Sequence, residues 1–154
     1  MSSPRLAIGR TSEKGRIYSV TTICHRREPL FLDPLSGGIV TNELRRLEED
    51  GVVENFAWVL MPEHLHWLFS LRSGSLARCM QLLKGRSAHA INRQRDCNDT
   101  VWQPGYYDHA LRDDDDDAVR KLAEYIVLNP VRAGLVAKVD DYAHWWCAWD
   151  LTKV

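Results

Sequence analysis

The chain has 154 residues, 45% of them hydrophobic, which suits one domain with a core of its own. No stretch approaches the roughly 20 apolar residues of a membrane helix. Residues 1–10 lack the apolar segment of a signal peptide, so we expect a cytoplasmic protein without a membrane partner. The net charge of −1 does not by itself indicate a nucleic-acid binder. The four cysteines form no C-x-x-C pair, which argues against a zinc ribbon or redox motif and favours reduced, mostly buried thiols.

The first half of the chain alternates strand and helix patterns. β-branched residues from Arg16 to Arg26 predict a strand, and the prolines and glycines of residues 29–38 predict a loop. Apolar residues at helical spacing then predict a helix from Gly38 to Asp50. Two further strands are expected at 52–61 and 65–71, separated by Pro62 and paired as a hairpin.

The second half begins with a helix from about Ser75, its expected N-cap, toward Ile91. A polar loop, residues 92–100, and a broken strand, residues 101–112, follow. The acidic run from Asp113 to Asp117 is interpreted as the N-cap and dipole partner of a third helix. That helix is expected over residues 118–129, ended or kinked by Pro130.

This order of elements, β-α-β-β-α-β with one more helix, is the ferredoxin-like arrangement. We therefore predict an α+β fold, a ferredoxin-like βαββαβ sandwich with an additional C-terminal helix. One domain is expected over residues 1–154, with a core of about 16–136 and an aromatic tail of 137–154.

Two histidines stand on one predicted strand. Side chains alternate along a strand, so His64 and His66 project from the same face, whereas Leu65 points toward the core. Two neighbouring imidazoles form half of a metal site. The H-x-H pattern alone also fits ordinary surface or core histidines, and both interpretations stay open here.

A tyrosine stands at the border of the apolar stripe of the last predicted helix. Tyr125 and Asn129 are four residues apart, which places them on one helical face. A packing phenol is the plain interpretation. A nucleophilic phenolate is the functional one, and it needs a metal, a base or a nearby cation to help ionise it.

Charge is distributed unevenly along the chain. From Arg72 to Arg112 there are seven basic and three acidic residues, whereas from Asp113 to the end there are five basic and nine acidic residues. A local basic face is enough for phosphate contacts, although solvated helix faces produce the same pattern. The numerous aromatic residues are either packing residues or platforms for unpaired bases.

Four segments, in this order and spacing, resemble one family. MPEHLHWLF (61–69) resembles the M-P-x-H-x-H segment of the HUH transposases with a single catalytic tyrosine. YIVLNPVRAGLV (125–136) resembles the tyrosine-bearing helix of one branch, the REP-associated tyrosine transposases. WQPGYYDHALR (102–112) resembles that branch's linking segment, and YSVTTICHRREPLF (18–31) resembles its first strand. The resemblance covers about residues 16–136.

This resemblance implies an activity and a site. Tyr125 would be the nucleophile that cuts single-stranded DNA beside a hairpin, such as a repetitive extragenic palindrome, and leaves a 5′-phosphotyrosine link. His64 and His66 would bind Mg²⁺ or Mn²⁺, and Asn129 stands where relatives place a polar third ligand, often glutamine. DNA affinity would rest on a local basic face: Arg78, Lys84, Arg86, Arg93 and Arg132. The resemblance also implies a monomer or homodimer associated with the bacterial nucleoid.

Three rival interpretations remain at this point. The chain could be a domesticated protein that binds hairpins without cutting them. It could be a small metallohydrolase in which His64 and His66 activate water, which predicts no covalent protein–DNA adduct. Finally, all these residues could be structural, in which case the histidines and Tyr125 would lie far apart.

Overall fold

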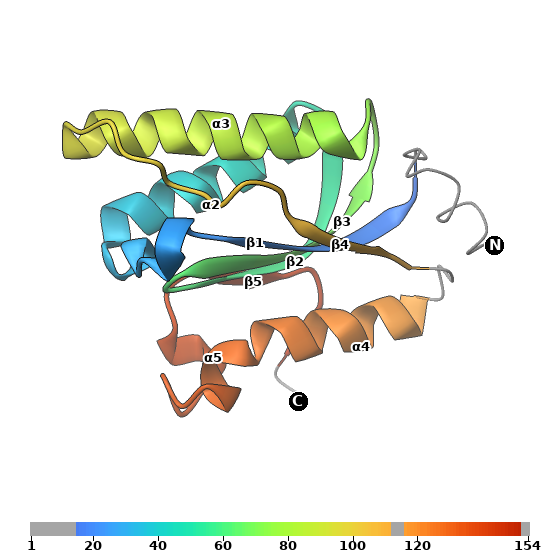
Figure 1. Cartoon of the computed structure of the whole chain (residues 1–154). Coiled ribbons are helices and arrows are strands. Elements are labelled where there is room, and N and C mark those ends of the chain that lie inside the picture. Colours follow the sequence, from blue (N-terminus) through green and yellow to red (C-terminus); the bar gives the residue numbers. More distant parts are fainter. Residues whose placement is uncertain (1–14, 112–115, 152–154) are drawn as a thin grey trace.

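A computed structural model describes residues 15–111 and 116–151 as a five-stranded antiparallel sheet with helices on both faces (Figure 1). The strand order is β4-β1-β3-β2-β5. The strands are β1 (Ile17–Ile23), β2 (Val53–Met61), β3 (His64–Leu71), β4 (Tyr107–Ala110) and β5 (Trp145–Cys147). The helices are α2 (Pro34–Glu49), α3 (Leu76–Arg95), α4 (Asp116–Val127) and the single turn α5 (Asn129–Arg132). Three short 3-10 turns are η1 (His25–Arg27), η2 (Leu30–Leu32) and η3 (Val139–Asp141).

Two apolar cores lie on the two faces of this sheet, because β3 is buried on both sides. Leu65, Trp67 and Phe69 point into the larger core, with α2 and α3. Leu68 points the other way, where it packs with Val119 and other residues of α4. Figure 1 shows α2 and α3 on one face and α4 with α5 on the other. The prediction of a ferredoxin-like sandwich with an extra helix is confirmed, and the sheet order of its first four strands matches it.

The first helix starts earlier than predicted. We expected a loop up to Gly38, but α2 begins at Pro34. Asp33 caps the helix, since its carboxylate accepts hydrogen bonds from the backbone N–H of Leu35 (3.1 Å) and the hydroxyl of Ser36 (3.0 Å). Proline suits the first helical turn, where its missing N–H costs nothing. The capping residue therefore outweighs the two glycines that suggested a loop.

Gly37 has a packing reason to lie inside this helix. A Cβ atom built on Gly37 would meet the imidazole of His144, whereas one built on Gly38 would meet nothing within 4 Å. Glycine at position 37 thus lets the C-terminal tail approach α2 closely.

The two glycines allow a matched stability test. Gly38→Ala is expected to stabilise the protein by about 0.5–1 kcal/mol, because alanine favours the helix. Gly37→Ala has the same helical gain but must displace His144, so we expect it to be the less stable variant. Thermal unfolding followed by circular dichroism measures both. Equal stabilisation by the two substitutions would show that His144 does not constrain this position.

The later elements differ from prediction mainly in length. α3 continues to Arg95 and ends at Asp96, which has a positive φ of 52°. Ser75 is its N-cap as predicted, since its hydroxyl accepts a hydrogen bond from the N–H of Arg78 (3.0 Å). Of the broken strand expected over 101–112, the described residues 101–111 contain the four residues of β4 and an isolated bridge between Trp102 and Cys24. Of the acidic run, residues 113–115 lie outside the described residues.

The aromatic tail adds a strand that was not predicted. β5 pairs with the edge of β2, and Trp146 stacks on Trp58 with ring centroids 5.2 Å apart. The hydroxyl of Tyr142 donates a hydrogen bond to the carbonyl of Leu60 (2.6 Å), which fixes the segment before β5. In the part of the chain that the structure describes, every helix is too short or too polar to span a membrane.

Candidate active site

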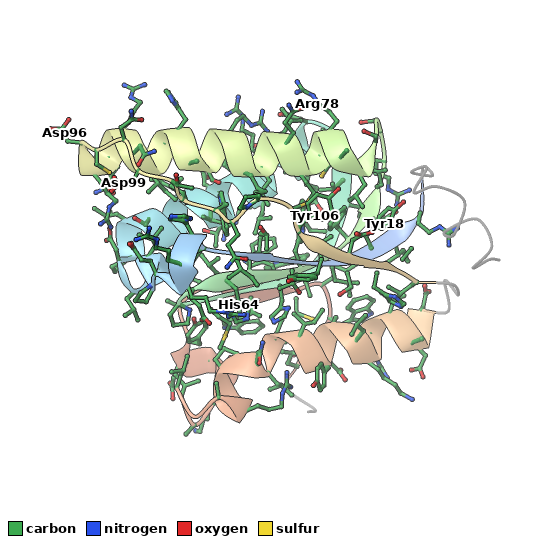
Figure 2. All side chains as sticks on the ribbon, in the orientation of Figure 1. Tyr18, His64, Arg78, Asp96, Asp99 and Tyr106 are labelled. Atoms are coloured by element: carbon green, nitrogen blue, oxygen red, sulfur yellow. The ribbon has the colours of Figure 1, made fainter. Side chains whose placement is uncertain are left out.

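The two histidines of β3 meet on the α4 face of the sheet. Their Nε2 atoms are 3.0 Å apart, and the two rings are perpendicular, with centroids 4.6 Å apart. Both side chains are half-buried. Figure 2 shows His64 between the sheet and the helices α4 and α5. The pair thus presents two ring nitrogens toward one point.

The outer nitrogen of each ring faces an oxygen. Nδ1 of His66 lies 3.0 Å from the hydroxyl of Thr21 on β1, directly opposite in the sheet register. Nδ1 of His64 lies 3.2 Å from a carboxylate oxygen of Glu63, in an ion-pair contact that lacks hydrogen-bond alignment. Arg27 holds the other carboxylate oxygen of Glu63 at 3.5 Å. Such contacts orient the two rings, with both Nε2 atoms turned toward each other.

The surroundings of His66 keep it neutral. Burial, together with the charges of His64 and Arg132, lowers its pKa to about 4, and Glu63 opposes this in part. At neutral pH the ring of His66 therefore carries a lone pair on one nitrogen. The Arg132 guanidinium is thus close enough to act electrostatically on His66.

Arg132 also contacts the tyrosine. Its guanidinium carbon lies 3.8 Å from the centre of the Tyr125 ring, a cation–π contact. Tyr125 is 62% exposed, since α4 buries Ala123 and Ile126 against the sheet and turns the phenol outward. One arginine, from α5, therefore contacts the phenol of α4 and acts electrostatically on His66 of β3. Sequence reasoning placed Arg132 only among the DNA-binding residues.

Asn129 occupies a different position from the one expected. The prediction that the helix of Tyr125 continues through Asn129 is wrong: α4 ends at Val127, and Asn129 begins α5. Pro130 has no N–H for a continuing helix, and Leu128 leaves helical geometry with a ψ of 2°. A break at Leu128 thus separates Asn129 from the helix of Tyr125, and a ligand role for Asn129 stays a prediction.

The histidine pair fits two adjacent positions around a divalent cation. Ligands at right angles, with bonds of about 2.1 Å, stand about 3.0 Å apart, which is the separation of the two Nε2 atoms. Within residues 15–111 and 116–151, no group of three or more histidines, cysteines or carboxylates could hold a metal. Any further ligand from these residues would therefore be an amide or hydroxyl oxygen. Substrate and water oxygens could fill the remaining positions.

The other predicted DNA-binding residues lie on α3, which covers the opposite face of the sheet. Arg78 and Arg93 are exposed, and Figure 2 shows Arg78 on the outer side of the helix. Lys84 instead donates hydrogen bonds to the carbonyls of Gln103 (2.8 Å) and Gly105 (2.5 Å).

Arg86 is also engaged within the protein. Its Nε lies 3.1 Å from a carboxylate oxygen of Glu43, which is buried between α2 and α3. A second, longer ion pair reaches Asp50 (4.0 Å). Lys84 and Arg86 thus hold elements of the fold together, which the charge pattern of the sequence does not reveal.

Sequence reasoning missed Thr21 and Glu63. Neither belongs to a distinctive local pattern, since threonine is ordinary in a strand and Glu63 stands in the turn between β2 and β3. The only signal for Thr21 would have been the register of β1 against β3, which is a tertiary property.

Comparison with known proteins gives consistent results. The family model described as "Transposase IS200 like" matches residues 14–127. A REP-associated tyrosine transposase of Escherichia coli K12 is 31% identical over 130 residues, which cover 83% of this chain and 73% of that protein.

Two solved structures have similar folds. The first, of a REP-associated tyrosine transposase bound to a REP hairpin, has a TM-score of 0.73 and 26% identity, and covers 94% of this chain and 82% of that one. The second, of a Deinococcus radiodurans protein, has a TM-score of 0.53 and 18% identity, and covers 71% of this chain and 88% of that one. The chain therefore belongs to the IS200-like transposase family, among the REP-associated tyrosine transposases, and is a DNA-cleaving enzyme.

Proposed function

We propose that this enzyme cuts and rejoins single-stranded DNA beside hairpins by means of a covalent 5′-phosphotyrosine intermediate on Tyr125. The observation that carries the proposal is the position of Arg132, which stacks on the Tyr125 ring and helps to lower the pKa of His66. A shared arginine of this kind supports the assignment of Tyr125 and the histidine pair to one site. The solved relative with a bound REP hairpin supports hairpin DNA as the partner.

The chemistry needs two transfers of one phosphoryl group. The Tyr125 oxygen attacks the scissile phosphorus and loses its proton to solvent, while the bond from phosphorus to the 3′-oxygen breaks and that oxygen takes up a proton. The 3′-hydroxyl of another strand later attacks the phosphotyrosine and releases the phenol. One phosphodiester is exchanged for another, so the sequence of steps needs no external energy source.

The chain's own residues prepare this reaction. Arg132 places a positive charge beside the phenol, where negative charge grows on the phosphate oxygens. Thr21 and Glu63 hold the imidazoles with both Nε2 atoms directed to one point. We propose that His64 and His66 bind Mn²⁺ or Mg²⁺ there, with Asn129 as a third ligand. The bound ion would supply Lewis-acid polarisation of the phosphate, and imidazole ligands favour Mn²⁺ over Mg²⁺.

The contact of Thr21 with His66 gives a testable prediction about this metal. Thr21→Val keeps the shape of the side chain but removes the hydroxyl that orients the ring. Loss of such a supporting contact is expected to weaken Mn²⁺ binding about 10- to 100-fold. Isothermal titration with Mn²⁺ measures the change, and Thr21→Ser, which restores the hydroxyl, is the control. Unchanged Mn²⁺ affinity in Thr21→Val would show that the hydroxyl does not orient His66.

A covalent-adduct assay tests the proposed function. The protein is mixed with Mn²⁺ and a labelled REP hairpin that carries a single-stranded flank, and the products are separated on a denaturing gel. A labelled band that migrates with the protein is expected. Cleavage without that band would indicate a hydrolase that uses water, and hairpin binding without cleavage would indicate a binding protein. Either result would overturn the proposal.

A further inference from the structure

A row of side chains crosses the sheet from the histidine pair to its open edge. His66 on β3 pairs with Thr21 on β1, and Thr21 pairs in turn with Tyr107 on β4. Directly opposed residues of antiparallel strands point to the same face. Adjacent strands are about 4.8 Å apart, so Tyr107 stands about 10 Å from His66 on the face that α4 covers.

Tyr107 is the outermost member of this row and is 68% exposed. β4 is an edge strand, so its outer side is open in the described part of the chain. Among the described residues, the only aromatic side chains with comparable exposure are Tyr107 and Tyr125. An exposed aromatic ring in line with a phosphate-cutting site is suited to stack on a base of the strand being cut.

A hollow of about 230 Å³ lies next to Tyr107. It is lined by Thr21 and Ile23 of β1 and by residues 103–107. Thr21 therefore has two roles. It forms part of the wall of the hollow, and its hydroxyl contacts His66. A group bound in the hollow would therefore lie against the residue that contacts His66.

The wall formed by residues 103–107 is held in a fixed shape. The N–H of Gln103 donates a hydrogen bond to the carbonyl of Ile23 (2.8 Å), and Gly105 turns the chain with a φ of 75°. The half-buried ammonium group of Lys84 donates to the carbonyls of Gln103 and Gly105. The hollow is thus formed before any ligand binds, which lowers the entropic cost of binding.

We infer that this hollow and Tyr107 form a subsite for one unpaired nucleobase of the DNA strand that carries the scissile phosphate. The Tyr107 ring supplies the stacking surface, and the carboxamide of Gln103 can both donate to and accept from a base edge. The inference rests on the proposed function, because it takes the ligand to be the single strand that Tyr125 attacks.

Binding to DNA with single missing bases tests the subsite. The probe is a REP hairpin with a single-stranded flank in which one position at a time lacks its base, and affinity is measured by fluorescence anisotropy in EDTA. For the parent protein, one flank position is expected to be sensitive, with a loss of about tenfold. In Tyr107→Ala, affinity for the intact probe is expected to fall by a similar factor. The missing base at that position should then have no further effect.

Two companion variants separate stacking from other causes. Tyr107→Phe retains the ring and is expected to recover most of the affinity lost in Tyr107→Ala. Asp108→Ala changes the next residue of β4, which is exposed but points to the other face, and is expected to keep the sensitive position. If Tyr107→Ala keeps the same sensitive position as the parent, or if Tyr107→Phe loses as much as Tyr107→Ala, the subsite is overturned.

The covalent-adduct assay on the parent protein keeps this test distinct from that of the proposed function. An adduct in the parent, together with an unchanged sensitive position in Tyr107→Ala, would overturn the subsite alone. No adduct, together with a sensitive position that depends on Tyr107, would overturn the proposed cleavage and support the subsite as a base-binding site.

Discussion

Replacement of Tyr125 by phenylalanine is expected to abolish covalent attachment to DNA, a loss of at least about 10³-fold in adduct formation. Phenylalanine keeps the ring under the Arg132 guanidinium but lacks the oxygen that attacks phosphorus. Because the side chain is 62% exposed, the substitution should change stability little. Hairpin binding measured without metal should therefore match that of the parent. Adduct on a denaturing gel is the readout.

A second tyrosine provides the control. The Tyr142 hydroxyl donates to the carbonyl of Leu60, and burial raises the pKa of this phenol to about 12, so it is a poor nucleophile. Tyr142→Phe removes an equivalent oxygen outside the site and should still form adduct. Adduct of parental yield in Tyr125→Phe would show that another residue is the nucleophile.

The second large effect is expected at His66. His66→Ala removes one of the two ring nitrogens that are 3.0 Å apart and should weaken Mn²⁺ binding at least about 100-fold. Adduct formation should fall with it, whereas hairpin binding in EDTA should persist. Isothermal titration with Mn²⁺ is the primary readout, because it does not depend on cleavage. In the parent, the lowered pKa of His66 means that protons compete with the metal at this ring only as the pH falls toward about 4.

A matched histidine lies outside the site. His89 is exposed on α3, on the other face of the sheet, and His89→Ala should bind Mn²⁺ and form adduct as the parent does. Parental Mn²⁺ affinity in His66→Ala would contradict the proposed metal site. That result would not bear on the assignment of Tyr125, which the Tyr125→Phe variant tests.

The structure shows how different kinds of sequence signal succeed or fail. The alternation of His64 and His66 on a strand depends only on local geometry, and the two rings do meet. The end of the helix that carries Tyr125 depends on local geometry too. However, α4 ends at Val127, two residues before the predicted end, and Asn129 lies in the next turn, α5. The sequence thus predicted the type of both elements, the strand of the histidines and the helix of Tyr125. It did not predict where that helix ends.

Contacts between distant segments were beyond the reach of any local pattern. Thr21 meets His66 across 45 positions of sequence because β1 pairs with β3 in one register. Lys84 and Arg86 looked like members of a DNA-binding face, but their partners are carbonyls of a later loop and a buried glutamate of an earlier helix. Charge counts along the chain carry no information about such partners.

The sequence by itself determined the ferredoxin-like order of strands and helices, since apolar periodicity and turn residues act over a few positions. Its motifs also indicated the tyrosine and the histidine pair. Only the tertiary structure decided what surrounds them: Arg132 against the phenol, Thr21 next to His66, and Tyr107 at the end of the same row. These contacts depend on strand register and on the turn from α4 to α5. Both are decided by burial of two cores at once, on the two faces of one sheet.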